Sequence, residues 1–546
     1  MISESFTGYY INSIKDNWHF NALSDYNGET FTYKQVGEYI LSIHNFFKNI
    51  NIQQGDKIAL LGKNSARWCI IYLATTTYGA VIVPILPDFK SDDLIKIINH
   101  SDSKALFIED SIYDKLEKEK LEQIKLIINL KDFNILYVND KLKDFAEIKN
   151  IEKIELIDNK EFNLKEIDNN KLAVISYTSG TTGNPKGVML THNCLAANMK
   201  YARENMPLKQ GDKILSFLPL AHTFGCAFEF LFPFTKGCHI TILTKTPSPQ
   251  IILEAFSKVK PALILSVPLI IEKIYKKQIL PKINKPIIKI FLKIPLLDKI
   301  FAKIIRDKLN KVFGNNFNEV VIGGAPFNHD AELFFKKIGF KYTVGYGMTE
   351  CGPLISYASH KVNKVGSSGK CINYLEMKIQ SDDPYNVPGE ILVKGENVMI
   401  GYYKNEEATK TILDEEGWLH TGDLATIDKE GFIFIKGRSK NMILGPDGKN
   451  IYPEEIESIL NNFYGIAESI IIEENGKLVA LVYPDYETLE KDNFNFEDLN
   501  KLMDKNLKEL NHKLPSYMNV SKIVITEKEF EKTPKKSIRR FIYQNK

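Results

Sequence analysis

The residues with the clearest chemical potential lie at positions 177–188, where the sequence reads YTSGTTGNPKGV. Glycines let backbone N–H groups approach an anion, hydroxyls donate to phosphate oxygens, and lysine adds positive charge. The spacing is not that of a Walker A motif, because Pro185 stands where the second glycine would be. A phosphate-binding loop is therefore predicted, with a flexible surface loop as the alternative. Its candidate contacts are Thr178, Ser179, Gly180, Thr181, Thr182, Gly183 and Lys186.

The segments on either side of this loop must hold it in place. Residues 172–177 read LAVISY, an apolar and β-branched run that predicts a buried strand. Met189–Tyr201 is predicted to form a helix, with Thr191 as its N-cap. Strand, glycine loop and helix is a common arrangement for holding phosphate.

Residues 177–188 resemble the signature loop of the adenylate-forming superfamily, which includes acyl-CoA synthetases, luciferases and peptide-synthetase adenylation domains. Further motifs follow in the order of that family over nearly the whole chain. The resemblance is weakest at residues 110–165 and 275–315. It implies ATP and Mg²⁺ as cofactors and a carboxylic acid as substrate. The acid attacks the α-phosphate while pyrophosphate leaves, so the site must supply positive charge and N–H donors.

Two motifs resemble the parts of the family that bind adenine and phosphate. The run GGAP would form a wall against adenine, where a flat base can lie on bare backbone; a plain β-turn is the alternative. In the run YGMTE, the resemblance implies that Tyr346 stacks on adenine, Thr349 contacts the α-phosphate and Glu350 holds Mg²⁺. The residues concerned are Gly323, Gly324, Ala325, Pro326, Tyr346, Gly347, Thr349 and Glu350.

Two further motifs would bind ribose and the acid. By resemblance, Asp423 in WLHTGD accepts hydrogen bonds from both ribose hydroxyls, as an ionised carboxylate can, and Arg438 reaches the same ribose. His222 in PLAH would help form the wall of the carboxylate pocket. A lone histidine is more often a satisfied core residue, so that alternative stays open.

The C-terminal motifs depart from the family at one position. Lys440 stands where the resemblance places a hinge, and residues 445–457 resemble the loop that lines the pantetheine channel, with Gly448 at the point of close approach. The family lysine that bridges the acid and the α-phosphate falls on Ser537. Serine cannot supply that charge, so the neighbouring Lys536 is the candidate. A merely basic, solvated tail is the alternative.

Composition argues against several other classes of protein. The 71 basic and 68 acidic residues nearly balance, at a net charge of +3, which argues against a dedicated nucleic-acid partner. The six cysteines are scattered without a Cys-x-x-Cys pair, which fits a reducing compartment and neither a disulfide framework nor a zinc site. The first residues, MISESFTGYY, show no signal peptide, and a cytoplasmic location is expected.

Alternating apolar and amphipathic runs predict an α/β fold in which layered, largely parallel sheets form a large N-terminal domain. The uncharged run Trp68–Pro87 predicts a helix and then a strand, and not a membrane span. Residues 366–438 predict a small β-rich subdomain. The expected division is an N-terminal domain over 1–438 and a small, mobile α+β C-terminal domain over 439–546. The predicted strands are 57–61, 80–85, 105–108, 126–130, 173–177, 214–217, 239–243, 263–267, 319–322 and 342–345.

We therefore interpret the chain as an ATP-dependent ligase that activates a fatty acid as acyl-adenylate and transfers it to CoA. Within the class, the alternatives are another carboxylic acid or a carrier-protein thiol as acceptor. A non-catalytic adenylate-binding protein is the alternative outside it. Residues 274–314 interleave apolar and basic side chains. That pattern is typical of a helix on an anionic membrane, and equally of an amphipathic helix packed on the core.

Overall fold

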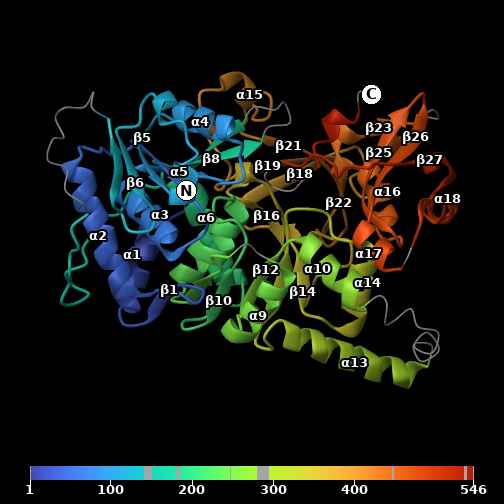
Figure 1. Ribbon diagram of the computed structural model, residues 1–546, viewed down its shortest axis with the longest axis horizontal. Helices are drawn as coiled ribbons and strands as arrows, with labels where there is room; N and C mark the ends of the chain where they lie inside the picture. The colour runs from blue at the N-terminus through green and yellow to red at the C-terminus, as the bar shows by residue number, and fades with distance from the viewer. Residues whose placement is uncertain are drawn as a thin grey trace.

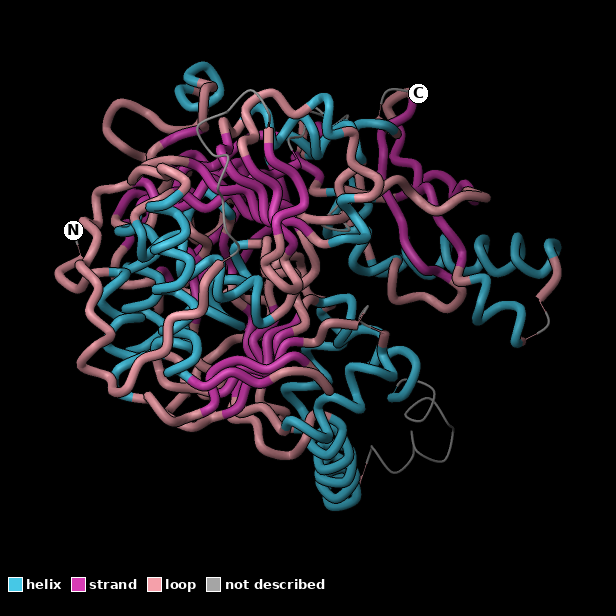
Figure 2. Tube along the Cα trace, turned by 60° about the vertical axis from the view of Figure 1, so that its left-hand side comes forward, coloured by secondary structure: helices cyan, strands magenta, loops and turns pink. Residues whose placement is uncertain are grey.

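The computed structural model describes residues 2–139, 151–179, 185–245, 248–279, 294–445, 448–492, 494–533 and 538–544. A large N-terminal part contains two sheets with helices around them, and a smaller C-terminal part lies to one side (Figure 1). Figure 2 shows the two large groups of strands one above the other, with helices beside them. This arrangement confirms the predicted fold class.

Among the described residues, the first sheet has seven strands in the order β14-β13-β12-β10-β11-β1-β2. All neighbours pair in parallel except β1 and β2, which form an antiparallel edge. The strands are β1 (Asn21–Asp25), β2 (Thr30–Thr32), β10 (Lys213–Ser216), β11 (His239–Ile242), β12 (Leu263–Ser266), β13 (Glu319–Ile322) and β14 (Tyr342–Val344).

The second sheet has eight described strands in the order β20-β9-β8-β4-β3-β5-β6-β7. Its centre is parallel, whereas β7, β9 and β20 are antiparallel to their neighbours. The strands are β3 (Lys57–Leu61), β4 (Val81–Ile85), β5 (Ser103–Ile108), β6 (Leu126–Asn129), β7 (Ile135–Val138), β8 (Leu172–Ser179), β9 (Pro185–Thr191) and β20 (Gly401–Tyr402).

Helix α3 (Ala66–Tyr78) shows why the core lies between the two sheets. It contacts β3 and β4 of one sheet and β1 of the other, and its side chains are apolar on almost every face. A helix that is apolar all round must be buried. The Ser65 side chain caps its N-terminus, and Gly79 ends it in the left-handed conformation. The predicted helix and strand over Trp68–Pro87 are thus confirmed.

Other helices cover the sheets or connect their strands. They are α1 (Phe6–Asp16), α2 (Tyr33–Asn49), α4 (Ser91–His100), α5 (Asp110–Tyr113), α6 (His192–Asn205), α7 (Thr223–Gly225), α8 (Phe232–Thr235), α9 (Pro249–Val259), α10 (Pro268–Ile274), α13 (Pro295–Val312), α14 (His329–Ile338) and α15 (Glu406–Lys410). In the parts of the chain described above, no helix is both long enough and apolar enough to cross a membrane.

The β-rich subdomain predicted over residues 366–438 is present. Its long strands pair antiparallel in the order β18-β19-β21-β22, and a shorter sheet, β15-β16-β17, precedes them. The strands are β15 (Tyr346–Gly347), β16 (Leu354–Tyr357), β17 (Lys370–Cys371), β18 (Leu375–Gln380), β19 (Gly389–Gly395), β21 (Leu419–Ile427) and β22 (Ile433–Arg438).

The C-terminal part has its own sheet, in the order β25-β26-β27. The turn between the first two strands is Asn475-Gly476, and both residues have positive φ, at 52° and 72°. A separate hydrophobic cluster runs from Ile451 to Val520, which supports the division at 438/439; that boundary stays a prediction. The elements are β23 (Ile443–Leu444), β24 (Asn450–Ile451), α16 (Pro453–Leu460), β25 (Ile466–Glu474), β26 (Lys477–Pro484), α17 (Tyr486–Lys491), α18 (Phe496–Lys513) and β27 (Val520–Ile525).

Candidate active site

The predicted phosphate loop joins two antiparallel strands, β8 and β9, in which Thr178 lies opposite Lys186. The prediction of a helix over Met189–Tyr201 is wrong at its start, because β9 continues to Thr191 and α6 begins one residue later. Val188 and Leu190 are buried with a period of two, which suits a strand. Thr191 does cap α6, as predicted, by accepting a hydrogen bond from a backbone N–H.

This correction changes how the loop would hold phosphate. Donors would come from the tip of a β-hairpin, not from the N-terminus of a helix. The tip itself, Gly180, Thr181, Thr182, Gly183 and Asn184, lies outside the described residues. Lys186 lies within them, at the start of the second strand, with its Nζ 5.0 Å from the centre of the Tyr402 ring.

The predicted adenine wall, residues 323–326, begins directly after the end of strand β13. Gly324 has a φ of +88°, a left-handed conformation that favours glycine. A Cβ atom added there would meet no atom closer than Val267, at 4.0 Å, so this backbone is open on one side. Ala325 and Pro326 are exposed beside it, whereas Gly323 is buried against Phe224. Such a surface can accept a flat base.

A tight turn places the adenine and metal candidates. A Cβ on Gly347 would lie 2.0 Å from the Pro353 carbonyl oxygen, so only glycine fits. Thr349 and Glu350 follow in a short 3₁₀ turn, in which Thr349 is buried. The hydroxyl of Tyr402 donates to Glu350 Oε1 at 2.8 Å. The other carboxylate oxygen of Glu350 accepts no hydrogen bond from the described residues.

Asp423 contacts both Arg438, the other ribose candidate, and Tyr346, the adenine candidate. It is the direct cross-strand partner of Arg438, and the Arg438 Nε lies 2.8 Å from its Oδ1. The Tyr346 hydroxyl donates to Oδ2 at 2.7 Å. Burial raises the pKa of Asp423, and the Arg438 charge and the Tyr346 donor oppose that rise. Because a carboxylate offers about four lone-pair sites, acceptor capacity remains for ribose hydroxyls.

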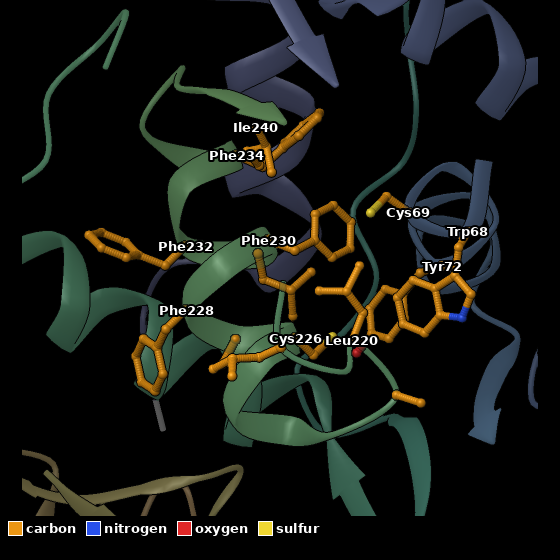
Figure 3. Close-up of a cluster of buried hydrophobic side chains, with 14 of the residues drawn as sticks. Trp68, Cys69, Tyr72, Leu220, Cys226, Phe228, Phe230, Phe232, Phe234 and Ile240 are labelled. Atoms are coloured by element: carbon orange, nitrogen blue, oxygen red, sulfur yellow. The ribbon is translucent and has the colours of Figure 1, made fainter. Parts of the chain in front are cut away.

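His222 lies in the turn that leads into α7, and its neighbours line a small apolar cavity. Leu220, Ala221 and Thr223 lie in the cavity wall, which also includes Tyr72 and Cys226. Figure 3 shows Tyr72 and Leu220 beside Cys226 in this cluster of buried side chains. The cavity holds ≈ 10 Å³, about the space of one water molecule. A larger acyl group would have to displace side chains.

Two of the C-terminal candidates, Lys440 and Gly448, lie in the described residues. Lys440 is exposed in a 3₁₀ turn directly after Arg438. Gly448 has a φ of +77°, and an added Cβ would meet no atom within 4 Å. Two further candidates lie outside the described residues. They are Lys536, which is predicted to supply the family charge, and Ser537, which stands where the family has its lysine.

The structure brings together Tyr346, Asp423 and Arg438 in one hydrogen-bonded group, and Lys186 and Glu350 on either side of Tyr402. Sequence reasoning missed Tyr402. No local pattern connects this tyrosine to a carboxylate 52 positions away.

Groups of three or more histidine, cysteine or acidic side chains suited to a metal are absent from the described ranges. Mg²⁺ does not need such a cage, because it commonly binds one or two carboxylates together with substrate phosphates and water. Glu350, with an oxygen open for coordination beside the predicted phosphate loop, fits that mode.

Comparison with known proteins gives the class first. Residues 14–403 match the family described as AMP-binding enzyme, so the chain belongs to that family and, through it, to the adenylate-forming superfamily. Relatives that match the chain include ligases named for CoA and a ligase named for an acyl-carrier protein.

Particular relatives differ in what their names say they act on. The chain is 31% identical over 461 residues to 4-coumarate–CoA ligase 2 from Petroselinum crispum, which covers 82% of this chain and 77% of the relative. It is 28% identical over 539 residues to the chloroplastic long-chain-fatty-acid–[acyl-carrier-protein] ligase AEE15 from Arabidopsis thaliana, at 84% and 73% coverage. The structure of anthranilate CoA ligase AuaEII with anthranoyl-AMP is similar in fold, with a TM-score of 0.79, 19% identity and coverage of 99% and 96%.

Proposed function

We propose that this protein is an ATP-dependent ligase that activates a fatty acid as its acyl-adenylate and transfers the acyl group to CoA. One observation carries the proposal: Lys186 and Glu350 flank a single tyrosine beside the predicted phosphate loop. A protein that only binds an adenylate has no need of a carboxylate with an open oxygen near phosphates. The family membership supports the same reaction class.

In the first half-reaction, an oxygen of the acid forms a bond to the α-phosphorus of ATP, and the bond to the bridging oxygen of pyrophosphate breaks. Lys186 would draw charge from the phosphates, and Thr349 would contact the α-phosphate. Asp423 and Arg438 would hold the ribose, while the Tyr346 ring, fixed through its hydroxyl, would stack on adenine. Glu350 would hold Mg²⁺, which supplies charge neutralisation at the phosphates when bound.

In the second half-reaction, the thiol sulfur attacks the acyl carbon, the bond from carbon to the phosphate oxygen breaks, and AMP leaves. The thiol gives up its proton to solvent or base. Donors arranged where charge develops contribute most to reactions of this kind. The Gly445–Tyr452 loop would border the thiol arm during this step.

The identities of the acid and of the acceptor thiol distinguish this proposal from its alternatives within the class. The cavity beside His222 is lined mostly by apolar side chains and by no charged one, which favours an apolar acyl group over a charged one. A fatty acid and an aryl acid both meet that condition. The relatives include ligases named for each, and for CoA and carrier-protein acceptors.

A peripheral contact with an anionic membrane belongs to the same proposal. On α13, Ile300 and Ile304 are about half exposed, while Ile305 and Leu309 are buried toward the body of the protein. Lysines 299, 303, 308 and 311 are exposed along the same helix. Exposed isoleucines among lysines suit a helix that lies on anionic lipid. The buried side shows that packing on the core also applies.

The test is acid-dependent exchange of pyrophosphate into ATP, followed by thioester formation with CoA and with a carrier protein. We expect straight-chain fatty acids of graded length to support both reactions with CoA. Exclusive use of aryl acids, or of carrier protein, would move the assignment to the corresponding alternative. Absence of exchange with every acid would favour a non-catalytic adenylate-binding protein.

Two variants test the site in the same exchange assay. Lys186→Ala removes a phosphate charge and Glu350→Ala removes the metal carboxylate. Each should slow exchange by at least about tenfold, or ~1.4 kcal/mol of barrier. Lys410→Ala, at the end of α15, serves as the matched control because this lysine is exposed in another segment. Wild-type rates in both site variants would contradict the site assignment.

A further inference from the structure

Tyr402 contacts two charged side chains that the proposed function needs. It is buried, with 7% of its surface exposed. Its hydroxyl donates to Glu350 Oε1 at 2.8 Å, and the Lys186 Nζ lies 5.0 Å from the centre of its ring. One side chain thus contacts both the candidate metal carboxylate and the candidate phosphate lysine.

The backbone around Tyr402 is held from both sides. Met399 N donates to the Glu350 carbonyl oxygen at 2.8 Å, and Tyr403 N donates to the Gly187 carbonyl oxygen at 2.8 Å. The N–H of Tyr402 itself donates to the Thr409 hydroxyl at 2.9 Å. The segment therefore connects the turn that carries Glu350 to the strand that carries Lys186, and little freedom is left to the ring.

We propose that Tyr402 is a positioning residue that keeps Lys186 and Glu350 separate and correctly aimed for ATP. Its hydroxyl fixes one oxygen of Glu350 and leaves the other for the metal. Its ring provides an aromatic face for the Lys186 ammonium.

Separation matters because the two charges would otherwise attract each other. A direct ion pair between lysine and glutamate would neutralise both, and ATP would have to break it. Across the described residues, neither Lys186 nor Glu350 forms an ion pair.

This inference rests on the proposed function, and the experiment separates the two. ATP binding is measured by calorimetry with EDTA and again with Mg²⁺, alongside the melting temperature of each variant. Tyr402→Phe removes the hydroxyl and keeps the ring, whereas Tyr402→Leu removes both. Tyr403→Phe is the matched control, because this adjacent tyrosine also donates to a carboxylate, Asp102, at 2.6 Å.

We expect Tyr402→Phe to bind ATP in EDTA as tightly as the wild type does. The factor by which Mg²⁺ increases its affinity for ATP should be about tenfold smaller than in the wild type, as fits the loss of one hydrogen bond to a charged group. Tyr402→Leu should also weaken metal-free binding, because Lys186 loses its aromatic face. Tyr403→Phe should bind like the wild type. A purely structural role would instead lower both affinities together with the melting temperature, and this pattern would overturn the inference.

A second comparison covers the case in which Tyr402→Leu does not fold. In the Glu350→Gln background, Tyr402→Phe should cause no further loss of the Mg²⁺ gain, because both changes act on the same contact. Additive losses would overturn the inference. If Tyr402→Phe binds ATP like the wild type, only the inference about Tyr402 is overturned. If the wild-type protein does not bind ATP at all, the proposed function is overturned as well.

Discussion

Asp423 shows how much of a binding site one carboxylate can organise. Its cross-strand pairing with Arg438 follows from the register of β21 and β22, and its contact with Tyr346 fixes the ring that would stack on adenine. Both partners oppose the effect of burial on its pKa. The motifs in the sequence identified all three residues. The hydrogen bond between Tyr402 and Glu350 had no such signal, because it depends on how two distant segments pack.

A second buried carboxyl, Glu229, gives a prediction about pH. It is fully buried, and its Oε2 accepts hydrogen bonds from Ser216, Phe217 and Leu218. Burial raises the pKa of Glu229 well above its usual range despite these donors. The native state then keeps a proton that the unfolded state releases above about pH 4.3. The free energy of unfolding should therefore contain a part that falls as pH rises, by up to ~1.4 kcal/mol per pH unit.

Glu229→Gln removes this titration and keeps the shape of a protonated carboxyl. We expect its melting temperature, relative to the wild type, to rise steadily from pH 5 to pH 8. The exposed substitution Glu415→Gln should show no comparable trend. A relative melting temperature of Glu229→Gln that stays constant over this range would mean that Glu229 is ionised in the native protein.

At the scale of elements, most strands were predictable because their apolar runs are continuous and end at polar residues. Strands β3 and β13 have the predicted bounds. Strand β9 was not recognised, because residues 189–201 also satisfy a helical pattern. The pairing of β9 with β8 on one side and β20 on the other decides in favour of a strand for residues 185–191. Local pattern could not contain that information.

Helix α13 is the element that we predict to contact an anionic membrane. It extends along one edge of the molecule in Figure 1, and its side chains Ile300 and Ile304 are about half exposed. The protein should bind vesicles that contain anionic lipid and dissociate as salt rises, because surface charges are screened over about 10 Å at 0.1 M salt. The double variant Ile300→Ser, Ile304→Ser should bind several-fold more weakly, since it removes the apolar contact.

Ile157→Ser is the control for this experiment, because Ile157 is also an exposed isoleucine, at 86%, on another segment. Vesicle co-sedimentation measures all three proteins. Equal binding to neutral and anionic vesicles would contradict the electrostatic part of the proposal, and unchanged binding by the double variant would contradict the role of α13.

At the scale of the whole molecule, few polar contacts among the described residues join the two parts. Lys276 donates to the Asn461 carbonyl oxygen, and Lys436 pairs with Glu455 at 3.2 Å. The Asn462 side chain accepts a hydrogen bond from Asn328 and donates one to Asp330. The hydrophobic clusters of the two parts are separate. Inter-domain contacts of this polar kind allow relative motion. A rotation about Lys440, as the resemblance implies, would therefore break few interactions.

The last prediction concerns the two half-reactions, which should respond differently to changes in the C-terminal part. If Lys536 supplies the charge that the family lysine provides, Lys536→Ala should slow adenylation by at least about tenfold, ~1.4 kcal/mol. It should leave thioester formation from supplied acyl-adenylate intact. Lys535→Ala is its control. If the family charge is lost instead, Ser537→Lys should raise the adenylation rate above the wild type.

Gly448→Trp should show the reverse pattern by filling the thiol channel, since adenylation does not use this loop. Its control is Gly448→Ala, because the φ of +77° strains any side chain there, and alanine adds that strain without the bulk. Single-turnover rates of each half-reaction measure the effects. Normal adenylation in Lys536→Ala together with no gain in Ser537→Lys would contradict both versions of the argument. Equal slowing of both half-reactions by Gly448→Trp would show that the loop does not serve the thiol step alone.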